Sequence, residues 1–201
     1  MRKSCLLGAV CAYIVLVSAS VNAAFIVDTG PGPGGVVGGT MLSATNFIAG
    51  QFTLASDFTL SSVEGWVSLS AINTFGTVVI YSDGGNIPGT ELFSGIFEGA
   101  GSNAQWLGAS GLAWNLAAGT YWAAFEVRSG QALAAAMPDP SVNPLTNDAF
   151  KPSYSNDWIL FNPTSLGIGL RIQSVPVPAA AWLFGSGLLG LIGIARRKKA
   201  A

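Results

Sequence analysis

The chain has 201 residues, of which 50% are hydrophobic and 9% are charged, and it contains no histidine. This composition is too apolar for an intrinsically disordered protein and is large enough for one domain with a hydrophobic core. The segment 24–174 holds all ten acidic residues but only three of the nine basic ones, so its net charge is −7. A basic nucleic-acid-binding surface is therefore excluded, and we expect no nucleic acid among the partners.

The first 23 residues have the order of a secretory signal peptide. Arg2 and Lys3 precede the apolar stretch Leu6 to Val17, and the small residues Val21 and Ala23 follow it. That apolar core is too short to span a bilayer, which takes about 20 residues. We therefore expect residues 1–23 to be a signal peptide, with export and cleavage after Ala23. Both cysteines would leave with it, so the mature chain would contain neither a disulfide nor a reactive thiol.

Residues 24–50 form a Gly/Pro-rich N-terminal segment, in which Gly30 to Gly39 predicts a loop or linker. From 51 to 174, short alternating or apolar segments are separated by turn residues such as those at 82–86. The predicted strands are 52–54, 58–60, 63–69, 77–81, 91–96, 112–116, 120–127, 132–137, 158–161 and 167–174. Short strands without an amphipathic helix predict an all-β ectodomain over 51–174, an antiparallel β-sandwich of jelly-roll-like type.

The alternation of side chains places one tryptophan on an apolar strand face and two others on polar strand faces. Trp114 falls on an apolar face and is expected in the core, whereas Trp66 falls with Glu64 and Trp122 falls with Glu126. One interpretation is a sugar-binding platform, in which Trp66 and Trp122 stack on pyranose rings while the carboxylates bind hydroxyl groups. The interpretation we favour is that a loop or a strand edge covers both indoles, because tryptophan is highly buried on average.

The sequence lacks the residues on which much enzyme chemistry depends. Without histidine it has no Ser-His-Asp arrangement, no usual general base and no common zinc ligand. We predict no catalytic, cofactor-binding or metal-binding residue, and no cofactor. A carboxylate pair for glycoside hydrolysis would have to come from Glu64, Glu126 or Asp157, and no spacing selects one. Loop oxygens suited to calcium occur at Asp83 with Asn86 and at Asn147 with Asp148, although such residues in turns usually bind backbone groups.

The end of the chain combines a proline element, an apolar stretch and a run of cations. The two prolines of Val175-Pro176-Val177-Pro178 keep the backbone extended. Residues 179–195 carry no charge, and 17 helical residues span about 25 Å, the short end of a bilayer span. We expect a single transmembrane helix here, with the ectodomain outside. The cytoplasmic stop is the basic run Arg196, Arg197, Lys198 and Lys199.

The segment from Val175 to Lys199 resembles the PEP-CTERM sorting signal of exosortase substrates, in its VPxPA-type variant. Val177 stands where the signal usually has glutamate. The resemblance implies that a membrane-bound cysteine peptidase of the exosortase type recognises Pro176 and Pro178, cuts nearby, and releases or transfers the protein. It also implies a Gram-negative bacterium, an inner-membrane-anchored precursor, and a final place on the cell surface or in the extracellular matrix.

These features predict an exported, non-enzymatic protein with a structural or adhesive role in exopolysaccharide or biofilm. The expected partners are the exosortase-type peptidase, the membrane through a transient C-terminal anchor, and extracellular polysaccharide. A first alternative is a carbohydrate-binding module that uses Trp66 and Trp122. A second alternative is a glycan-active enzyme built on a carboxylate pair.

Overall fold

The computed structural model describes residues 24–35, 38–71, 74–152, 155–161 and 166–175. Its strands belong to one compact unit, Ala23–Pro176. The predicted signal peptide, and the sorting signal apart from Val175, lie outside the described residues. Within the described ranges, no helix has the length and apolar character needed to cross a bilayer.

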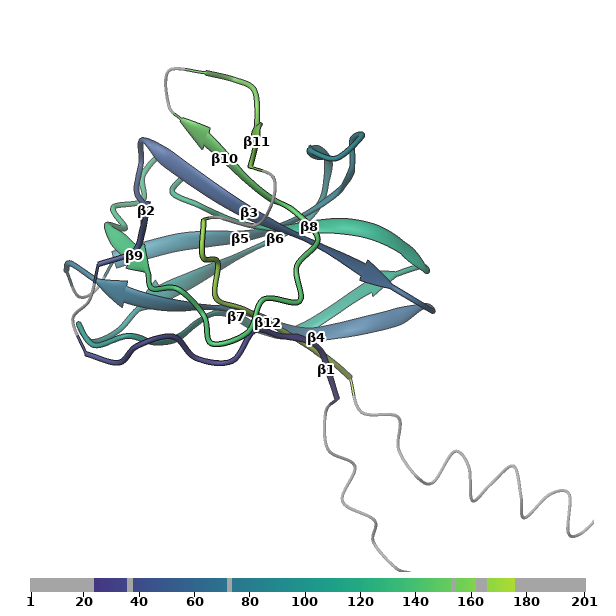
Figure 1. Cartoon of the computed structure of the whole chain (residues 1–201), viewed down its shortest axis with the longest axis horizontal. Helices are drawn as coiled ribbons and strands as arrows, with labels where there is room; N and C mark the ends of the chain where they lie inside the picture. The colour runs from purple at the N-terminus through teal and green to yellow at the C-terminus, as the bar shows by residue number, and fades with distance from the viewer. Residues whose placement is uncertain (1–23, 36–37, 72–73, 153–154, 162–165, 176–201) are drawn as a thin grey trace, which may run out of the picture. The chain divides into compact units, whose positions relative to one another are not determined.

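Two antiparallel sheets account for the regular structure of the described residues, which confirms the all-β prediction (Figure 1). Sheet 1 has the order β1-β12-β4-β9-β2, and β7 pairs with β4. Its strands are β1 (Phe25–Asp28), β2 (Thr40–Leu42), β4 (Phe58–Leu69), β7 (Gln105–Leu116), β9 (Ala135–Met137) and β12 (Leu170–Ser174). Sheet 2 has the order β11-β10-β3-β8-β5-β6. Its strands are β3 (Asn46–Leu54), β5 (Thr74–Asp83), β6 (Pro88–Gly99), β8 (Gly119–Glu126), β10 (Asp148–Pro152) and β11 (Ile159–Phe161).

Four of the strand pairs are nested within one another along the chain. The hairpin β5–β6 is enclosed by the pair β4–β7, which is enclosed by β3–β8, and this in turn by β2–β9. Successive pairs fall alternately in sheet 2 and sheet 1. A long antiparallel double ribbon is thereby wound into two layers. The pairs β1–β12 and β10–β11 then extend the two sheets.

The core lies between the two layers because one face of each strand is apolar. In β4, for example, Leu60, Val63 and Val67 are fully buried, and they pack in one cluster with residues of sheet 2 such as Phe125. Trp114 packs against this cluster and stacks on Phe93 with ring centroids 5.4 Å apart. The prediction that Trp114 faces the core is confirmed.

The segment 24–50 contributes strands to both sheets. It contains β1, β2 and the start of β3, so the predicted boundary at residue 51 falls inside a strand. Residues 30–35 form a loop as expected, and Ala104 N–H donates to the carbonyl of Gly35 over 2.8 Å. Two further differences concern strand number: 58–60 and 63–69 form one strand with an irregularity between Leu60 and Ser62, and β10 was not predicted.

The predicted turn at 82–86 is confirmed and joins β5 to β6. Gly84 N–H donates to the carbonyl of Ile87 over 2.8 Å. Gly85 and Asn86 have φ values of 93° and 67°, in the left-handed region that glycine and asparagine tolerate best. Asp83 pairs with Pro88 at the base of the turn.

A substitution at Gly108 tests the close approach of β7 to β4. A Cβ at this position would lie 2.1 Å from the carbonyl oxygen of Val63 and 2.6 Å from the Cα of Glu64, so the backbone itself would have to move. We expect Gly108→Ala to lower the free energy of unfolding by about 2 kcal/mol or more in urea denaturation. Gly34→Ala is the matched control, because nothing lies within 4 Å of its Cβ. It should change the free energy by less than about 0.5 kcal/mol. Equal effects of the two substitutions would show that the strands do not meet in this way.

Candidate functional site

Four side chains from four strands form a continuous row on the outer face of sheet 1. The guanidinium carbon of Arg171, on β12, lies 5.3 Å from the ring centroid of Phe25 and 4.4 Å from that of Trp106. Trp106 in turn contacts Trp66 edge to face, with centroids 5.4 Å apart. We call Phe25, Arg171, Trp106 and Trp66 the aromatic row. Strands β1, β12, β7 and β4 all contribute to it.

The register of sheet 1 explains why these residues meet. Trp66 on β4 is directly opposite Trp106 on β7, and Arg171 on β12 is directly opposite Glu64 on β4. All of these lie on the face that alternates with the buried residues of their strands. Strands β12 and β7 flank β4, and the long side chain of Arg171 extends over β4 to the ring of Trp106.

An ion pair fixes the guanidinium group in the row. The Nε and Nη2 of Arg171 both donate to Oε2 of Glu64, over 3.0 and 2.7 Å. The two side chains are only 22% and 21% exposed, so the pair is partly shielded from water. An arginine held in this way presents a flat surface that can stack on aromatic rings.

The row remains partly open to solvent. Phe25 is 48% exposed, and Trp66 and Trp106 are half-buried. Loop 30–35 borders the row, because Trp66 Nε1 donates to the carbonyl of Pro33 over 3.2 Å. Exposed aromatic surface therefore lies beside charged groups of fixed geometry.

A strip of polar side chains continues from the row along the same face. Ser62 Oγ donates to Oε1 of Gln173 over 3.2 Å, and Thr59 Oγ1 donates to Oδ1 of Asn115 over 2.6 Å. Trp66 and Thr59 are seven residues apart on β4, which corresponds to about 23 Å of strand. We call this surface the polar strip.

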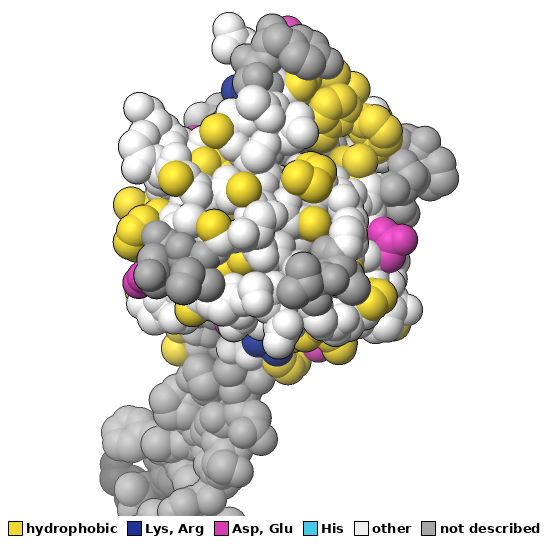
Figure 2. Space-filling model, turned by 90° about the vertical axis from the view of Figure 1, so that its left-hand side faces the viewer, with side chains coloured by type: hydrophobic (Ala, Val, Ile, Leu, Met, Phe, Trp, Pro, Cys, Tyr) yellow, Lys and Arg dark blue, Asp and Glu magenta, His cyan; other side chains and the backbone are white. Residues whose placement is uncertain are grey.

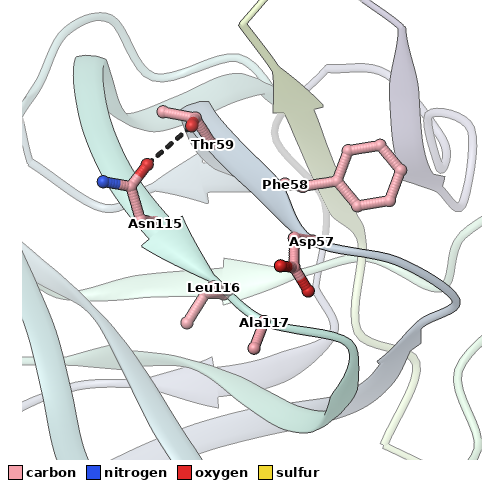
Figure 3. A pocket seen from close by; sticks show the side chains of 6 residues that line it. All are labelled: Asp57, Phe58, Thr59, Asn115, Leu116 and Ala117. Atoms are coloured by element: carbon pink, nitrogen blue, oxygen red, sulfur yellow. Dashed lines mark hydrogen bonds between the residues drawn. The ribbon is translucent and has the colours of Figure 1, made fainter.

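The polar strip ends at a pocket of about 320 Å³. Figure 3 shows the side chains that line it: Asp57, Phe58, Thr59, Asn115, Leu116 and Ala117. Its carboxylate is engaged, since Asp57 Oδ1 accepts the N–H of Ala118 over 2.9 Å.

The structure does not bring Trp66 and Trp122 together. Trp122 lies on β8, on the outer face of sheet 2, and it is fully buried in a small cluster with Tyr81 and Trp158 packed against it. Its Nε1 donates to Oδ1 of Asp83 over 2.9 Å. The proposed pairing of Trp66 with Trp122 in one platform is therefore wrong, and Trp122 is covered as the favoured interpretation expected. The partner of Trp66 is Trp106, which lay outside the predicted strands.

The candidate catalytic carboxylates are also dispersed. Glu64 is paired on the outer face of sheet 1, Glu126 lies on the outer face of sheet 2, and Asp157 is in the connection between β10 and β11. Glu126 is almost completely buried and accepts hydrogen bonds from Tyr81 Oη over 2.5 Å and Arg128 Nε over 2.9 Å. Burial, reinforced by the bond to Glu126, raises the pKa of Tyr81 above its usual range.

Arg128 links Glu126 to a further acid, Glu91. Its Nη2 lies 2.7 Å from Oε2 of Glu91, and these hydrogen bonds lower the pKa of Glu91. Within the described residues, no three His, Cys, Asp or Glu side chains are grouped so that they could hold a metal ion.

The residues considered for calcium make hydrogen bonds within the fold. Burial alone would raise the pKa of Asp83, but hydrogen bonds from Trp122 and Gln51 hold it below its usual value. Asn147 donates to Oε1 of Gln51 over 2.5 Å. Asp148 is fully buried: its Oδ2 accepts the N–H of Leu166 over 3.2 Å, while its Oδ1 has no hydrogen-bond partner in the described structure.

A second surface is mainly apolar. Figure 2 shows hydrophobic side chains gathered at the top of the molecule, the region where Figure 1 places β10 and β11. Ile159 and Leu160 of β11 are 39% and 37% exposed. The nearby cavity of about 170 Å³ is lined by Thr40, Met41, Asn46, Ile48, Phe150, Phe161 and Leu166. This surface differs from the aromatic row, in which charged groups lie among the rings.

Comparison with known proteins gives no match to a family model, to a curated protein or to a solved structure. The aromatic row and the polar strip are therefore interpreted from their chemistry alone.

The buried carboxyl of Asp148 predicts a pH-dependent stability. Burial raises its pKa from 3.8 to about 6, so the folded protein binds this proton more tightly than the unfolded chain does. The cost of burying the charge is full above pH 6 and disappears as the pH falls towards 4. We expect Asp148→Asn to be more stable than the unchanged protein by about 1–3 kcal/mol at pH 7.5. In urea denaturation the difference should shrink between pH 6 and pH 4, and a difference that stays constant with pH would contradict this account.

Proposed function

We propose that this chain is an exported, non-enzymatic protein of the cell surface or extracellular matrix, processed at its C-terminus by an exosortase-type peptidase. The observation that carries the proposal is the order of residues from Val175 to Lys199: two prolines, an uncharged stretch and a basic run. Recognition by the peptidase is assigned to Pro176 and Pro178. The stop at the cytoplasmic side is assigned to Arg196, Arg197, Lys198 and Lys199.

The end of the sheet supports this assignment. Strand β12 ends at Ser174, and Val175 N–H donates to the carbonyl of Thr59 over 2.8 Å. The proline element begins at the next residue, Pro176. The last strand therefore stops where a peptidase would need an extended, unpaired backbone.

The beginning of the sheet supports export with cleavage after Ala23. The first strand starts at Phe25, two residues after the proposed cleavage point. The carbonyl of Ala24 accepts both the N–H and the Oγ–H of Ser174, over 3.0 and 3.3 Å. Both proposed processing points thus lie just beyond the strands β1 and β12, which pair with each other.

The strand pairing and the ion pairs of the described residues support a structural or adhesive role. The nested pairs β2–β9, β3–β8, β4–β7 and β5–β6 have the pairing of an eight-stranded jelly roll, which supports the jelly-roll-like form of the sandwich. Glu64 and Glu126, two of the three carboxylates considered for glycoside hydrolysis, are each bound to an arginine. The two ion pairs lie in different sheets, so these carboxylates do not form the close pair that glycoside hydrolysis requires. We place the precursor in the inner membrane of a Gram-negative bacterium and the processed protein on its surface or in its polysaccharide matrix.

The sorting proposal is tested by the mass of the C-terminus. In a host with an exosortase, the protein should lose residues beyond the proline element, while in a host without one it should keep them. The double variant Pro176→Ala, Pro178→Ala should stay uncut in both hosts, because the extended recognition element is lost. Pro140→Ala, in a loop far along the chain from this element, is the control and should be cut normally. Identical C-terminal masses in the two hosts for the unchanged protein would refute the proposal.

A further inference from the structure

We infer that the outer face of sheet 1 binds a neutral polysaccharide of pyranose units, laid from the aromatic row along the polar strip. This rests on the proposed function only in that a surface or matrix location brings the face into contact with polysaccharide. The residues that carry it are Phe25, Trp106 and Arg171 at one end and Gln173 and Asn115 further along.

The aromatic row offers the apolar part of such a site. Phe25 keeps 48% of its surface exposed although it lies on a strand of the sheet, and Trp106, which contacts the same guanidinium group of Arg171, is half-buried. A pyranose ring has one face rich in C–H groups, which packs on aromatic rings, and a rim of hydroxyl groups. Exposed aromatic surface that is bordered by fixed polar groups suits a ligand that has both an apolar face and a rim of hydroxyl groups.

The polar groups beside the row have unused hydrogen-bonding capacity. Both bonds from Arg171 go to Oε2 of Glu64, which leaves Oε1 of that carboxylate as an acceptor. The bonds at Gln173 and Asn115 use the oxygen of each amide and leave the two NH₂ groups as donors. Strand pairing thus holds hydrogen-bond acceptors and donors of the protein on one face of the sheet. The hydroxyl groups of a sugar can donate to the acceptors and accept from the donors.

The charge of the surface selects a neutral ligand. Arg171 is neutralised by Glu64, and Arg128, on the other sheet, is bound by Glu91 and Glu126. The segment 24–174 has ten acids and three bases. An anionic polymer would meet overall repulsion, and both arginines among the described residues, Arg128 and Arg171, are already paired with carboxylates.

The shape favours a chain over a single sugar. The row and the strip extend along β4 from Trp66 to Thr59, which are seven residues apart, about 23 Å of strand. The strip ends at the pocket of about 320 Å³ beside Thr59 and Asn115, which would hold one further unit. A ligand that spans this surface must be extended.

Affinity electrophoresis in native gels tests the inference directly. The full-length chain, purified in a detergent without a sugar headgroup, is run in gels that contain hydroxyethyl cellulose, laminarin or dextran as neutral probes. Alginate serves as the anionic probe. We expect retardation by at least one neutral polymer. Any retardation by alginate should be the same in Phe25→Ala and Trp106→Ala as in the unchanged protein, because the cations at 2–3 and 196–199 bind it independently of the aromatic row. Phe25→Ala and Trp106→Ala should each weaken the retention about tenfold, the effect of removing a central aromatic contact.

A tryptophan on the opposite outer face provides the matched control. Trp158 packs on Tyr81 at a ring distance of 5.9 Å, outside the proposed site, so Trp158→Ala should keep the full affinity. Thermal unfolding verifies that each variant is folded, and Phe25→Ala removes a side chain that is already half exposed.

The inference would be overturned if no neutral probe retarded the unchanged protein, or if alginate alone did so. It would also be overturned if Trp158→Ala lost binding while folded Phe25→Ala and Trp106→Ala kept it. C-terminal processing should be normal in all three variants. A protein that binds the neutral probe but is never cut would overturn the sorting proposal alone.

Discussion

Backbone pairing along β4 holds together both the fold and the candidate site. This strand of 12 residues pairs with β7 on one side and with β12 and β9 on the other. Its alternation sends Val63 and Val67 into the core and Glu64 and Trp66 to the outer face. A slip of one residue would exchange the two sets and place a carboxylate and an indole in the core, so the core fixes the register that assembles the aromatic row.

The outer face of sheet 2 is organised in a different way. A sandwich usually keeps polar residues on its outer faces, but here Trp122 and Glu126 are almost or entirely enclosed. Trp158, from the connection between β10 and β11, packs over this face. Tyr81 and Arg128 satisfy the buried carboxylate of Glu126. Trp66 and Trp122 both alternate with core residues in the sequence, but Trp122 is fully buried and Trp66 is partly exposed. The difference arises because Trp158 packs over the outer face of sheet 2.

Local patterns predicted the local features of this molecule. Alternation identified most of the strands, the inward direction of Trp114 and the outward direction of Trp66, and turn residues identified the β5–β6 connection. Alternation states which face of a strand a residue occupies, but it does not state which sheet the strand joins or what covers that face. The meeting of Phe25 with Gln173 and Arg171, and of Trp66 with Trp106, depends on pairing between distant segments. The orphaned oxygen of Asp148 likewise depends on tertiary packing, which no neighbouring residue in the sequence reveals.

The pairing of β12 has a mechanical consequence. This strand lies between β1 and β4, antiparallel to both, and it leads directly to Val175. A force applied to the chain beyond Val175, directed along the strand, would load two rows of backbone hydrogen bonds in shear at the same time. Shearing breaks many bonds together, whereas peeling breaks them one after another. Arg171 lies on the same strand, four residues before Val175, so tension between a ligand on the outer face and the C-terminal end would run through β12 and spare the rest of the sandwich.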